Sequence, residues 1–378
     1  MKTYRSYFIL VALGLIQLSC KDDMDMETPV LECNEILVGW NLTSYAFPET
    51  PAQRDLFFLS NEVGFSVGNV GIILQTLNGG QSWKYLHAAY SQEAGYIDDA
   101  VTDAMLYCIY FINDSVGFVG GDDEDDYFDG TFTDAVFLRT RDGGKSWTKV
   151  YLEGISKVND LIFFDELNGI GLFYLEDADY NHRYQVRTTT DGGYHWTEVV
   201  LPESTLLSRS FVTSPSKVMV VAENNLNINE LWSSGDMGMT WQSTSLPGKN
   251  FSSIYFINDM VGLADCTSKD FANSIYQTRD GGATWVELET PFYGWSLIHF
   301  NSELEGFVIN PVYDYIEGGG ELHAYISSFE GYQTYDGGSS WDRKEVRGSC
   351  GFEGLHYSPS NSNLYFLDNQ VFFRLEKP

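Results

Sequence analysis

Six copies of one eight-residue segment constrain the fold of this 378-residue chain more than any other feature. Each copy runs from Thr or Ser, through Asp-Gly-Gly or a close variant, to a polar residue and Trp. The copies occupy residues 76–83, 140–147, 189–196, 234–241, 278–285 and 334–341. Asp-Gly-Gly between two β-prone runs indicates a tight hairpin turn, because Gly supplies positive φ angles and Asp bonds nearby backbone N–H groups. The Trp then begins the returning strand and packs against a neighbouring sheet.

A second repeated segment precedes each hairpin. It begins with Phe and reaches Gly six residues later, and it reads strand, turn, strand. We call these two residues the marker Phe and the marker Gly. The copies occupy 58–65, 111–118, 163–170, 256–263 and 300–307, with a degenerate copy at 211–218 in which Lys217 replaces the Gly. Each complete unit therefore supplies four strands, which is the content of a propeller blade.

A seventh unit is predicted from the spacing of the others. The distance from a hairpin Trp to the next marker Phe is 16 residues after Trp147 and 15 after the next three hairpins. Counting 15 from Trp341 reaches His356, where three strands are predicted at 355–360, 364–368 and 371–375. A fourth strand is available near the N-terminus, at 36–42.

We therefore predict an all-β protein whose residues 34–378 form a seven-bladed β-propeller of four-stranded antiparallel blades. Pairing of the N-terminal strand with the C-terminal blade would close the ring and leave no exposed sheet edge there. This pairing also predicts that deleting residues 34–43 unfolds the protein.

The hairpin segment resembles the Asp-box, or bacterial neuraminidase repeat, written Ser/Thr-x-Asp-x-Gly-x-Ser/Thr-Trp. Asn78 and His195 are departures from that pattern. Together with the Phe-x-Asn-Asp-x-x-Gly-Phe segments, the chain resembles the photosystem II stability/assembly factor-like branch of Asp-box propellers, almost throughout the part that follows the leader. The resemblance implies an assembly or scaffolding role. The residues expected to stabilise the turns are Asn78, Trp83, Asp142, Trp147, Asp191, Trp196, Asp236, Trp241, Asp280, Trp285, Asp336 and Trp341.

The N-terminus has the features of an export signal. Lys2 and Arg5 precede an apolar stretch over 8–18, which is too short to span a bilayer as a permanent anchor. We expect residues 1–19 to be a signal peptide.

Cys20 directly follows a small residue and resembles the acylated cysteine of a lipobox, although Gln17 stands where such motifs usually carry Leu. The alternative is an ordinary secretory signal with an incidental cysteine. Lys21-Asp22-Asp23 resembles the tag of surface-exposed lipoproteins of Bacteroidetes. We expect lipidation of Cys20, an acidic tether over 20–33, and an outer-membrane lipoprotein that faces the outside of the cell and contacts the membrane only through its lipid.

The charge balance excludes nucleic acid as a partner. Asp and Glu number 53 against 22 Lys and Arg, giving a net charge of −31, which becomes −33 once Lys2 and Arg5 leave with the signal. A polyanion would be repelled by such a chain. We expect a soluble monomeric body. Four cysteines follow Cys20 without metal-ligand spacing, and their disulfide pairing is left open: Cys33, Cys108, Cys266 and Cys350.

Length variation predicts the binding face. Strands within a blade alternate in direction, so the first-to-second and third-to-fourth turns share one face, and their lengths are nearly constant. From marker Gly to hairpin Trp the count varies as 19, 30, 27, 23 and 35 in five units. The insertions responsible, on the opposite face, occupy 88–103, 121–134, 176–183 and 311–323.

These insertions carry aromatic side chains among many acids, a mixture suited to sugar stacking or to protein contact. The candidate binding residues are Tyr90, Tyr96, Tyr127, Phe128, Tyr180, Arg183, Tyr313 and Tyr315. The alternative is that the insertions are merely tolerated surface loops.

No cofactor is expected. The acidic run at 122–126 offers oxygen ligands for calcium at Asp122, Glu124 and Asp126. However, Tyr127 stands where the calcium-loop pattern requires the sharp-turn Gly. A solvated loop is the favoured interpretation.

Catalytic patterns are weaker still. Gly64-Phe-Ser-Val-Gly68 spells a nucleophile elbow, but the repeat places it on an ordinary blade strand. Sialidases bind a sugar carboxylate with three arginines, whereas this chain lacks their Arg-Ile-Pro signature and places only Arg54, Arg183 and Arg209 near the variable face. We expect no catalytic residues and a lipoprotein that binds a glycan or protein partner. The alternatives are a glycoside hydrolase, sialidase-like or otherwise, and a structural component of an envelope complex.

Overall fold

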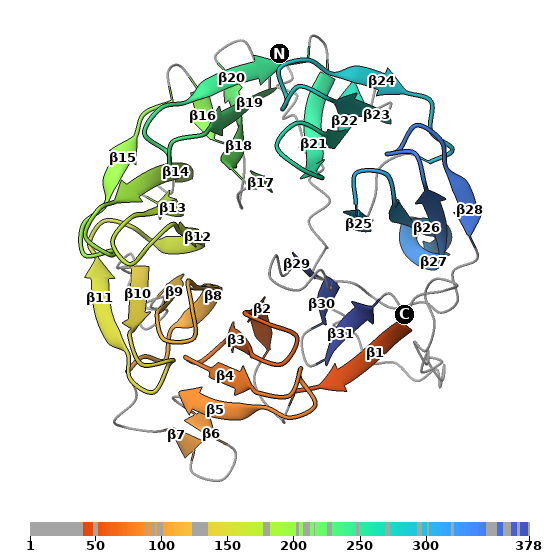
Figure 1. The fold of residues 1–378 in the computed structure, drawn as a ribbon. Helices are drawn as coiled ribbons and strands as arrows, with labels where there is room; N and C mark the ends of the chain where they lie inside the picture. The colour runs from red at the N-terminus through yellow and green to blue at the C-terminus, as the bar shows by residue number, and fades with distance from the viewer. Residues whose placement is uncertain are drawn as a thin grey trace.

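The computed structural model is built of β-strands throughout the residues it describes, which confirms the all-β prediction. It describes residues 41–376 except 48–51, 88–89, 92–94, 97–100, 123–134, 177–181, 202–203, 207–211, 215, 225–228, 247–248, 269–272, 293–296, 301, 319–320, 345–353, 358–363 and 369–370. Most strands belong to antiparallel groups of four, arranged around a common axis (Figure 1). The first strand of each group lies nearest that axis and the fourth lies at the periphery.

In three four-stranded sheets the strands follow one another in sequence order. The first contains β2 (Gln53–Phe58), β3 (Gly64–Gly68), β4 (Ile73–Thr76) and β5 (Lys84–His87). The second contains β8 (Met105–Phe111), β9 (Gly117–Asp122), β10 (Ala135–Thr140) and β11 (Thr148–Leu152). The third contains β21 (Lys249–Phe256), β22 (Gly262–Ser268), β23 (Asn273–Thr278) and β24 (Val286–Leu288).

A nine-stranded sheet unites two further groups of four. One group is β12 (Lys157–Phe163), β13 (Gly169–Glu176), β14 (His182–Thr189) and β15 (Thr197–Val199). The other is β17 (Val212–Ser214), β18 (Lys217–Asn224), β19 (Asn229–Ser234) and β20 (Gln242–Ser245). The short strand β16 (Ser204–Leu206) pairs with both β14 and β18 and so joins the groups, which the sequence did not predict.

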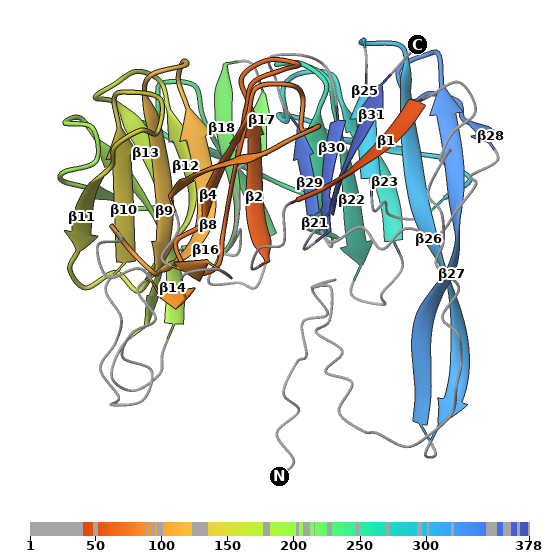
Figure 2. The ribbon, with the colours of Figure 1, turned by 90° about the horizontal axis from the view of Figure 1, so that it is seen from below.

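The sixth hairpin unit forms a sheet with two very long strands. It contains β25 (Leu297–Phe300), β26 (Gly306–Gly318), β27 (Glu321–Thr334) and β28 (Asp342–Lys344). The insertion at 311–323, expected as a loop, lengthens β26 and β27 into a hairpin that projects beyond the disc (Figure 2). A smaller hairpin, β6 (Tyr90–Ser91) with β7 (Gly95–Tyr96), lies within the 88–103 insertion.

The last sheet combines the two ends of the described chain. Its order is β1 (Asn41–Ala46), β31 (Val371–Glu376), β30 (Leu364–Asp368) and β29 (Gly354–Tyr357). β1 pairs with β31 antiparallel from Asn41 opposite Glu376 to Ala46 opposite Val371. The N-terminal strand predicted over 36–42 overlaps β1 only at its last two residues, and 36–40 lie outside the described residues.

Aromatic packing explains the repeated Phe and Gly. The ring of Phe111 lies so close to Gly117 that a Cβ on Gly117 would come 2.5 Å from it, and the marker glycines of four other units meet their own Phe in the same way. Phe111 also stacks on Phe65 of the preceding sheet, with ring centroids 3.8 Å apart, and meets Trp147 edge-on at 6.2 Å. The repeat therefore encodes the core that joins one sheet to the next.

Candidate functional site

The carboxylates of the repeat turns are occupied within their own turns. Asp142 Oδ1 accepts the hydroxyl of Thr140 at 2.8 Å and the amide N–H of Ser146 at 2.9 Å, while Oδ2 accepts the hydroxyl of Ser146 at 2.6 Å. These hydrogen bonds, among which those from Ser146 have the largest effect, lower the pKa of Asp142 to about 2. The same bonds recur around Asp191, Asp236, Asp280 and Asp336, and the side-chain amide of Asn78 replaces the carboxylate in the first turn.

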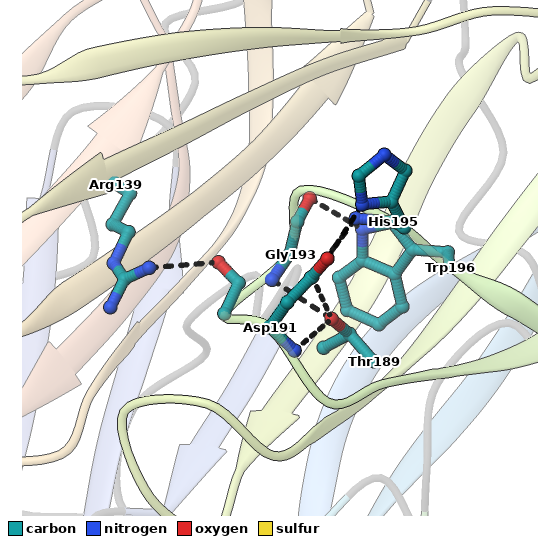
Figure 3. A network of polar contacts seen from close by, with 7 residues as sticks. Arg139, Thr189, Asp191, Gly193, His195 and Trp196 are labelled. Carbon is teal, nitrogen blue, oxygen red and sulfur yellow. Dashed lines mark hydrogen bonds and ion pairs between the residues drawn. The ribbon is translucent and has the colours of Figure 1, made fainter.

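The turn at 189–196 shows the complete network (Figure 3). The Thr189 hydroxyl accepts the N–H of Gly193 at 2.9 Å, and Trp196 Nε1 donates to the Gly193 carbonyl at 3.0 Å. His195 Nδ1 lies 2.6 Å from Asp191 Oδ2, so His195 fills the role that Ser or Thr fills in the other turns. Each group of this turn is therefore engaged in shaping the hairpin.

The turn also connects neighbouring sheets. Arg139 lies in β10 of the preceding sheet and donates to the carbonyl of Gly192 at 3.4 Å (Figure 3). It also donates to the carbonyl of Glu166 at 3.0 Å. Gln277 reaches the carbonyl of Gly337 in the same manner, at 2.6 Å. In five units the two turns of this face are joined by a hydrogen bond, as where the amide of Gly192 donates to the carbonyl of Leu167 at 2.8 Å.

On the opposite face, the structure describes only part of the predicted binding set. Arg183 is exposed in β14. Tyr90 and Tyr96 pair across β6 and β7, and Tyr313 and Tyr315 belong to the projecting part of β26. Tyr127, Phe128, Tyr180, Glu124 and Asp126 lie outside the described residues, while Asp122 ends β9.

A repeated β-bulge is the feature that the sequence analysis missed. The pairing register slips in β2, β8, β12 and β21, each time four residues before the marker Phe. The bulged residues are Arg54, Tyr107, Asn159 and Ser252. In all four strands the residue just before the bulge is buried, while the bulged residue is partly or fully exposed.

The spacing of apolar residues in the sequence indicates the bulge. Core-facing residues before the marker Phe of β12 are Leu161 and Val158, which are three residues apart instead of two. An extra residue in the strand produces such a break in alternation and re-aims the bulged side chain. Bulges are frequent next to functional sites.

Three consecutive inner strands meet at these bulges. The Lys157 ammonium of β12 lies 3.2 Å from the ring centroid of Tyr107, and the Arg54 guanidinium of β2 lies 5.9 Å from the same centroid. Tyr107 therefore has two cations close to its ring in a strongly acidic protein. The side-chain oxygen of Asn159 is buried without a hydrogen-bond partner among the described residues. We call Arg54, Tyr107, Lys157 and Asn159 the axial cluster.

The carboxylate beside this cluster is turned toward the backbone. Asp55 accepts the amide N–H of Leu56 at 2.7 Å and that of Ile109, in the next sheet, also at 2.7 Å. Its charge is thereby used to tie β2 to β8. The axial cluster lies where the inner strands begin, and therefore away from the repeat turns and on the side of the insertions.

Two of the sequence candidates for chemistry can be checked in the described residues, the elbow-like serine and a metal site. Ser66, the serine of the elbow-like sequence, is buried in β3 and donates to Gln53 Oε1 at 2.8 Å and to the Asp55 carbonyl at 2.9 Å. No group of three or more His, Cys, Asp and Glu side chains is placed to hold a metal within the described part of the chain.

Cys108 and Cys266 are buried free thiols whose pKa is raised by burial, while Cys33 and Cys350 lie outside the described residues. Across the described strands and turns there is no apolar helix long enough to cross a bilayer.

Comparison with known proteins identifies the fold. No protein-family model matches the sequence, and no curated protein is similar to it. Among solved structures, YCF48 bound to a D1 peptide is similar with a TM-score of 0.60 at 17% identity, over 90% of this chain and 97% of that one. YCF48 from Cyanidioschyzon merolae gives a TM-score of 0.58 at 14% identity, over 89% and 98% of the two chains.

An enzyme is similar to the same extent. The GH74 enzyme of Niastella koreensis gives a TM-score of 0.58 at 12% identity, and the match covers 88% of this chain but only 53% of the enzyme. At these identities the similarity establishes the fold alone, and binding proteins and glycosidases share it. The chain is an all-β protein of four-stranded antiparallel sheets whose structural neighbours are YCF48 and GH74 β-propellers.

Proposed function

We propose that this chain is a non-catalytic propeller that binds a protein or glycan partner on the face of its insertions, centred on the axial cluster. The observation that carries the proposal is the meeting of Arg54, Tyr107 and Lys157 from three consecutive inner strands. An aromatic ring flanked by cations offers stacking, cation–π and charged hydrogen bonds within one small area. Asn159 is the bulged residue of β12, in the place that Tyr107 has in β8.

A protein partner is the favoured class. A structural neighbour, YCF48, was solved with a D1 peptide bound, which supports peptide recognition on a propeller of this shape. The aromatic residues of the insertions, among them Tyr90 and Tyr313, would extend the contact beyond the axis, since Tyr supplies large rigid contact area at small entropic cost. A scaffolding or assembly role would use the same face.

The scaffold in this proposal has seven blades and a closed ring. The pairing of β1 with β31 supports closure, because it joins strands from the two ends of the described chain. Residues 1–19 would be removed on export, Cys20 would be acylated, and residues 20–33 would tether the propeller, as a monomer, to the outer face of the outer membrane. The six repeat turns are Asp-boxes in this view.

The experiment compares two tyrosines that each carry a cation on their ring. Tyr107 with Lys157 lies in the axial cluster, whereas Tyr151 with Lys149, at 4.5 Å, lies on the outer strand β11 of the same sheet. A photo-reactive phenylalanine analogue replaces either Tyr107 or Tyr151 in the lipidated protein, in its native cells. We expect a discrete protein cross-link from position 107 and none from position 151.

A glycan array with hydrolysis assays on every hit covers the second partner class. Binding that Tyr107→Ala abolishes and Tyr151→Ala leaves intact would identify a glycan ligand at the axial cluster. Turnover of any hit would refute the non-catalytic proposal in favour of a glycoside hydrolase, which needs two carboxylates at a set separation. Equal cross-linking from both positions, with no glycan binding, would refute the site itself.

A further inference from the structure

The face of the repeat turns carries exposed apolar side chains that the turn chemistry does not need. Eight of them lie on the turns of the four consecutive hairpin units that begin at β12, β17, β21 and β25, and two of these are Phe164 and Tyr335. We call the other six the apolar turn patch: Leu167, Tyr194, Met237, Met239, Met260 and Leu304. Met239 and Leu304 are the most exposed, at 67% and 60%. Single exposed apolar residues are common, whereas a set gathered on one face marks an interaction surface.

The patch residues occupy equivalent places in adjoining turns. The carbonyls of Leu167, Met260 and Leu304 each accept the amide N–H of the first turn glycine of their own unit, at 2.8, 2.9 and 2.9 Å. Neighbouring turns are also tied together, since Asn258 donates to Glu303 at 2.7 Å across two sheets. Leu167, Met260 and Leu304 therefore occupy the same position in the turns of their units.

Met237 has a backbone conformation that is unfavourable for a residue with a side chain. Its φ is +61°, in the left-handed region, where the other five repeat turns carry Gly with φ between +69° and +78°. A side chain in that region costs about 1–2 kcal/mol. Met237 is 41% exposed, so burial in the fold recovers only part of that cost. Strain kept at an exposed position points to a role for the side chain outside the fold.

The charges around the patch define the partner. Asp165, Glu166, Glu303 and Glu305 lie in the same turns. The cations of these turns are fewer and each has a partner: Arg279 donates to Gln277 at 2.8 Å and Lys217 to the carbonyl of Gly281 at 3.3 Å. Arg141, in the preceding hairpin, pairs with Glu166 at 3.5 Å. An acidic surface with flexible thioether and leucine side chains complements a basic amphipathic segment, whose cations meet the acids while its apolar face meets Met and Leu. A second copy of this acidic chain would be repelled, and an anionic membrane would be too.

We propose that the apolar turn patch is a second docking surface, opposite to the axial cluster, for a basic amphipathic segment of a partner protein. Met237, Met239 and Met260 supply the adaptable contacts. Leu167, Tyr194 and Leu304 extend the apolar area on either side. This surface is independent of the ligand bound at the axial cluster.

The test uses methionine methyl groups as local reporters. The full folded chain is labelled with ¹³C at the methionine methyl groups and titrated with a synthetic peptide of Leu and Lys in helical periodicity. We expect the signals of Met237, Met239 and Met260 to shift, while that of Met219, which is fully buried, stays in place. Met105, in the inner strand β8, reports on the axial side.

Variants and conditions separate the proposal from its rivals. Met239→Ser with Met260→Ser should weaken peptide binding at least about tenfold, and added salt should weaken it further. Met237→Gly should weaken binding while raising the urea midpoint, a combination that a merely structural residue would not give. Shifts at Met105 alone, equal binding of a Leu/Glu peptide, shifts on adding phosphatidylcholine vesicles, or shifts on raising protein concentration without peptide would each overturn the proposal.

Discussion

Replacement of the marker glycine Gly117 by alanine tests whether the repeat encodes packing between sheets. A Cβ at this position would lie 2.5, 2.6 and 2.7 Å from three ring atoms of Phe111, about 1 Å closer than the optimal separation of carbon atoms. The ring has little room to move, because it stacks on Phe65 with centroids 3.8 Å apart and meets Trp147 edge-on at 6.2 Å. The strain must therefore move a packed sheet.

The expected cost is large for a single methyl group. Overpacking a tight core costs about 1–3 kcal/mol, and the enclosure of Phe111 from two sides places Gly117→Ala at about 2–3 kcal/mol. Phe111→Leu removes the opposing ring and by itself costs about 1–2 kcal/mol. The double variant should then be about 1–2 kcal/mol more stable than the sum of the single effects predicts, since the clash disappears with the ring.

The assay is urea unfolding followed by tryptophan fluorescence, with changes in midpoint converted at a common m-value. Gly235→Ala is the matched control, because a Cβ there meets nothing within 4 Å and the position has no left-handed φ. It should change stability by less than about 0.5 kcal/mol. A Gly117→Ala variant as stable as the control, or strictly additive effects in the double variant, would refute the reasoning.

Three further predictions concern charge and closure. Burial raises the pKa of Asp265 from 3.8 to about 6, so the folded state binds the proton more tightly than the unfolded state does. The stability that this proton contributes is fully present below pH 4 and is lost as the pH rises through 6. Asp265→Asn should therefore leave the melting temperature unchanged at pH 4 and raise the free energy of unfolding by about 2 kcal/mol at pH 8. Asp142 has the opposite pH dependence, because its pKa is lowered to about 2 in the folded state. The stability that its charge contributes is present above pH 4 and is lost as the pH falls toward 2. Asp142→Asn should therefore reduce the steepness of acid unfolding, measured by circular dichroism. Deletion of residues 41–46 removes the strand that covers β31 and should lower the melting temperature sharply, and unchanged melting would rule out closure through β1.

The parts of the fold that sequence predicted are those with local causes. The hairpin at 140–147 is defined by bonds among Thr140, Asp142 and Ser146, all within one eight-residue segment. Strands at the C-terminal end were also located correctly: 364–368 corresponds to β30, and 371–375 lies within β31. Turn chemistry and strand spacing act over a few residues, and both can therefore be identified without knowing what lies beside them.

The candidate sites were predicted less well. The insertions were located, but that at 311–323 proved to be an extension of β26 and β27. The axial cluster was missed because Arg54, Tyr107 and Lys157 are about 50 residues apart in sequence and meet only when three sheets stack around the axis. The break in alternation that marks each bulge was visible in the sequence, yet its meaning depends on the pairing register.

By itself, the sequence determined a repeating β-hairpin unit, its turn chemistry and the face on which lengths vary, because these depend on contacts within each repeat. Only the tertiary structure decided which side chains face the axis, which apolar residues stay exposed on the turn face, and that Met237 holds a left-handed conformation where its five counterparts are Gly. Exposure and proximity are properties of sheets packed against one another, and the chemistry of a site emerges from that packing.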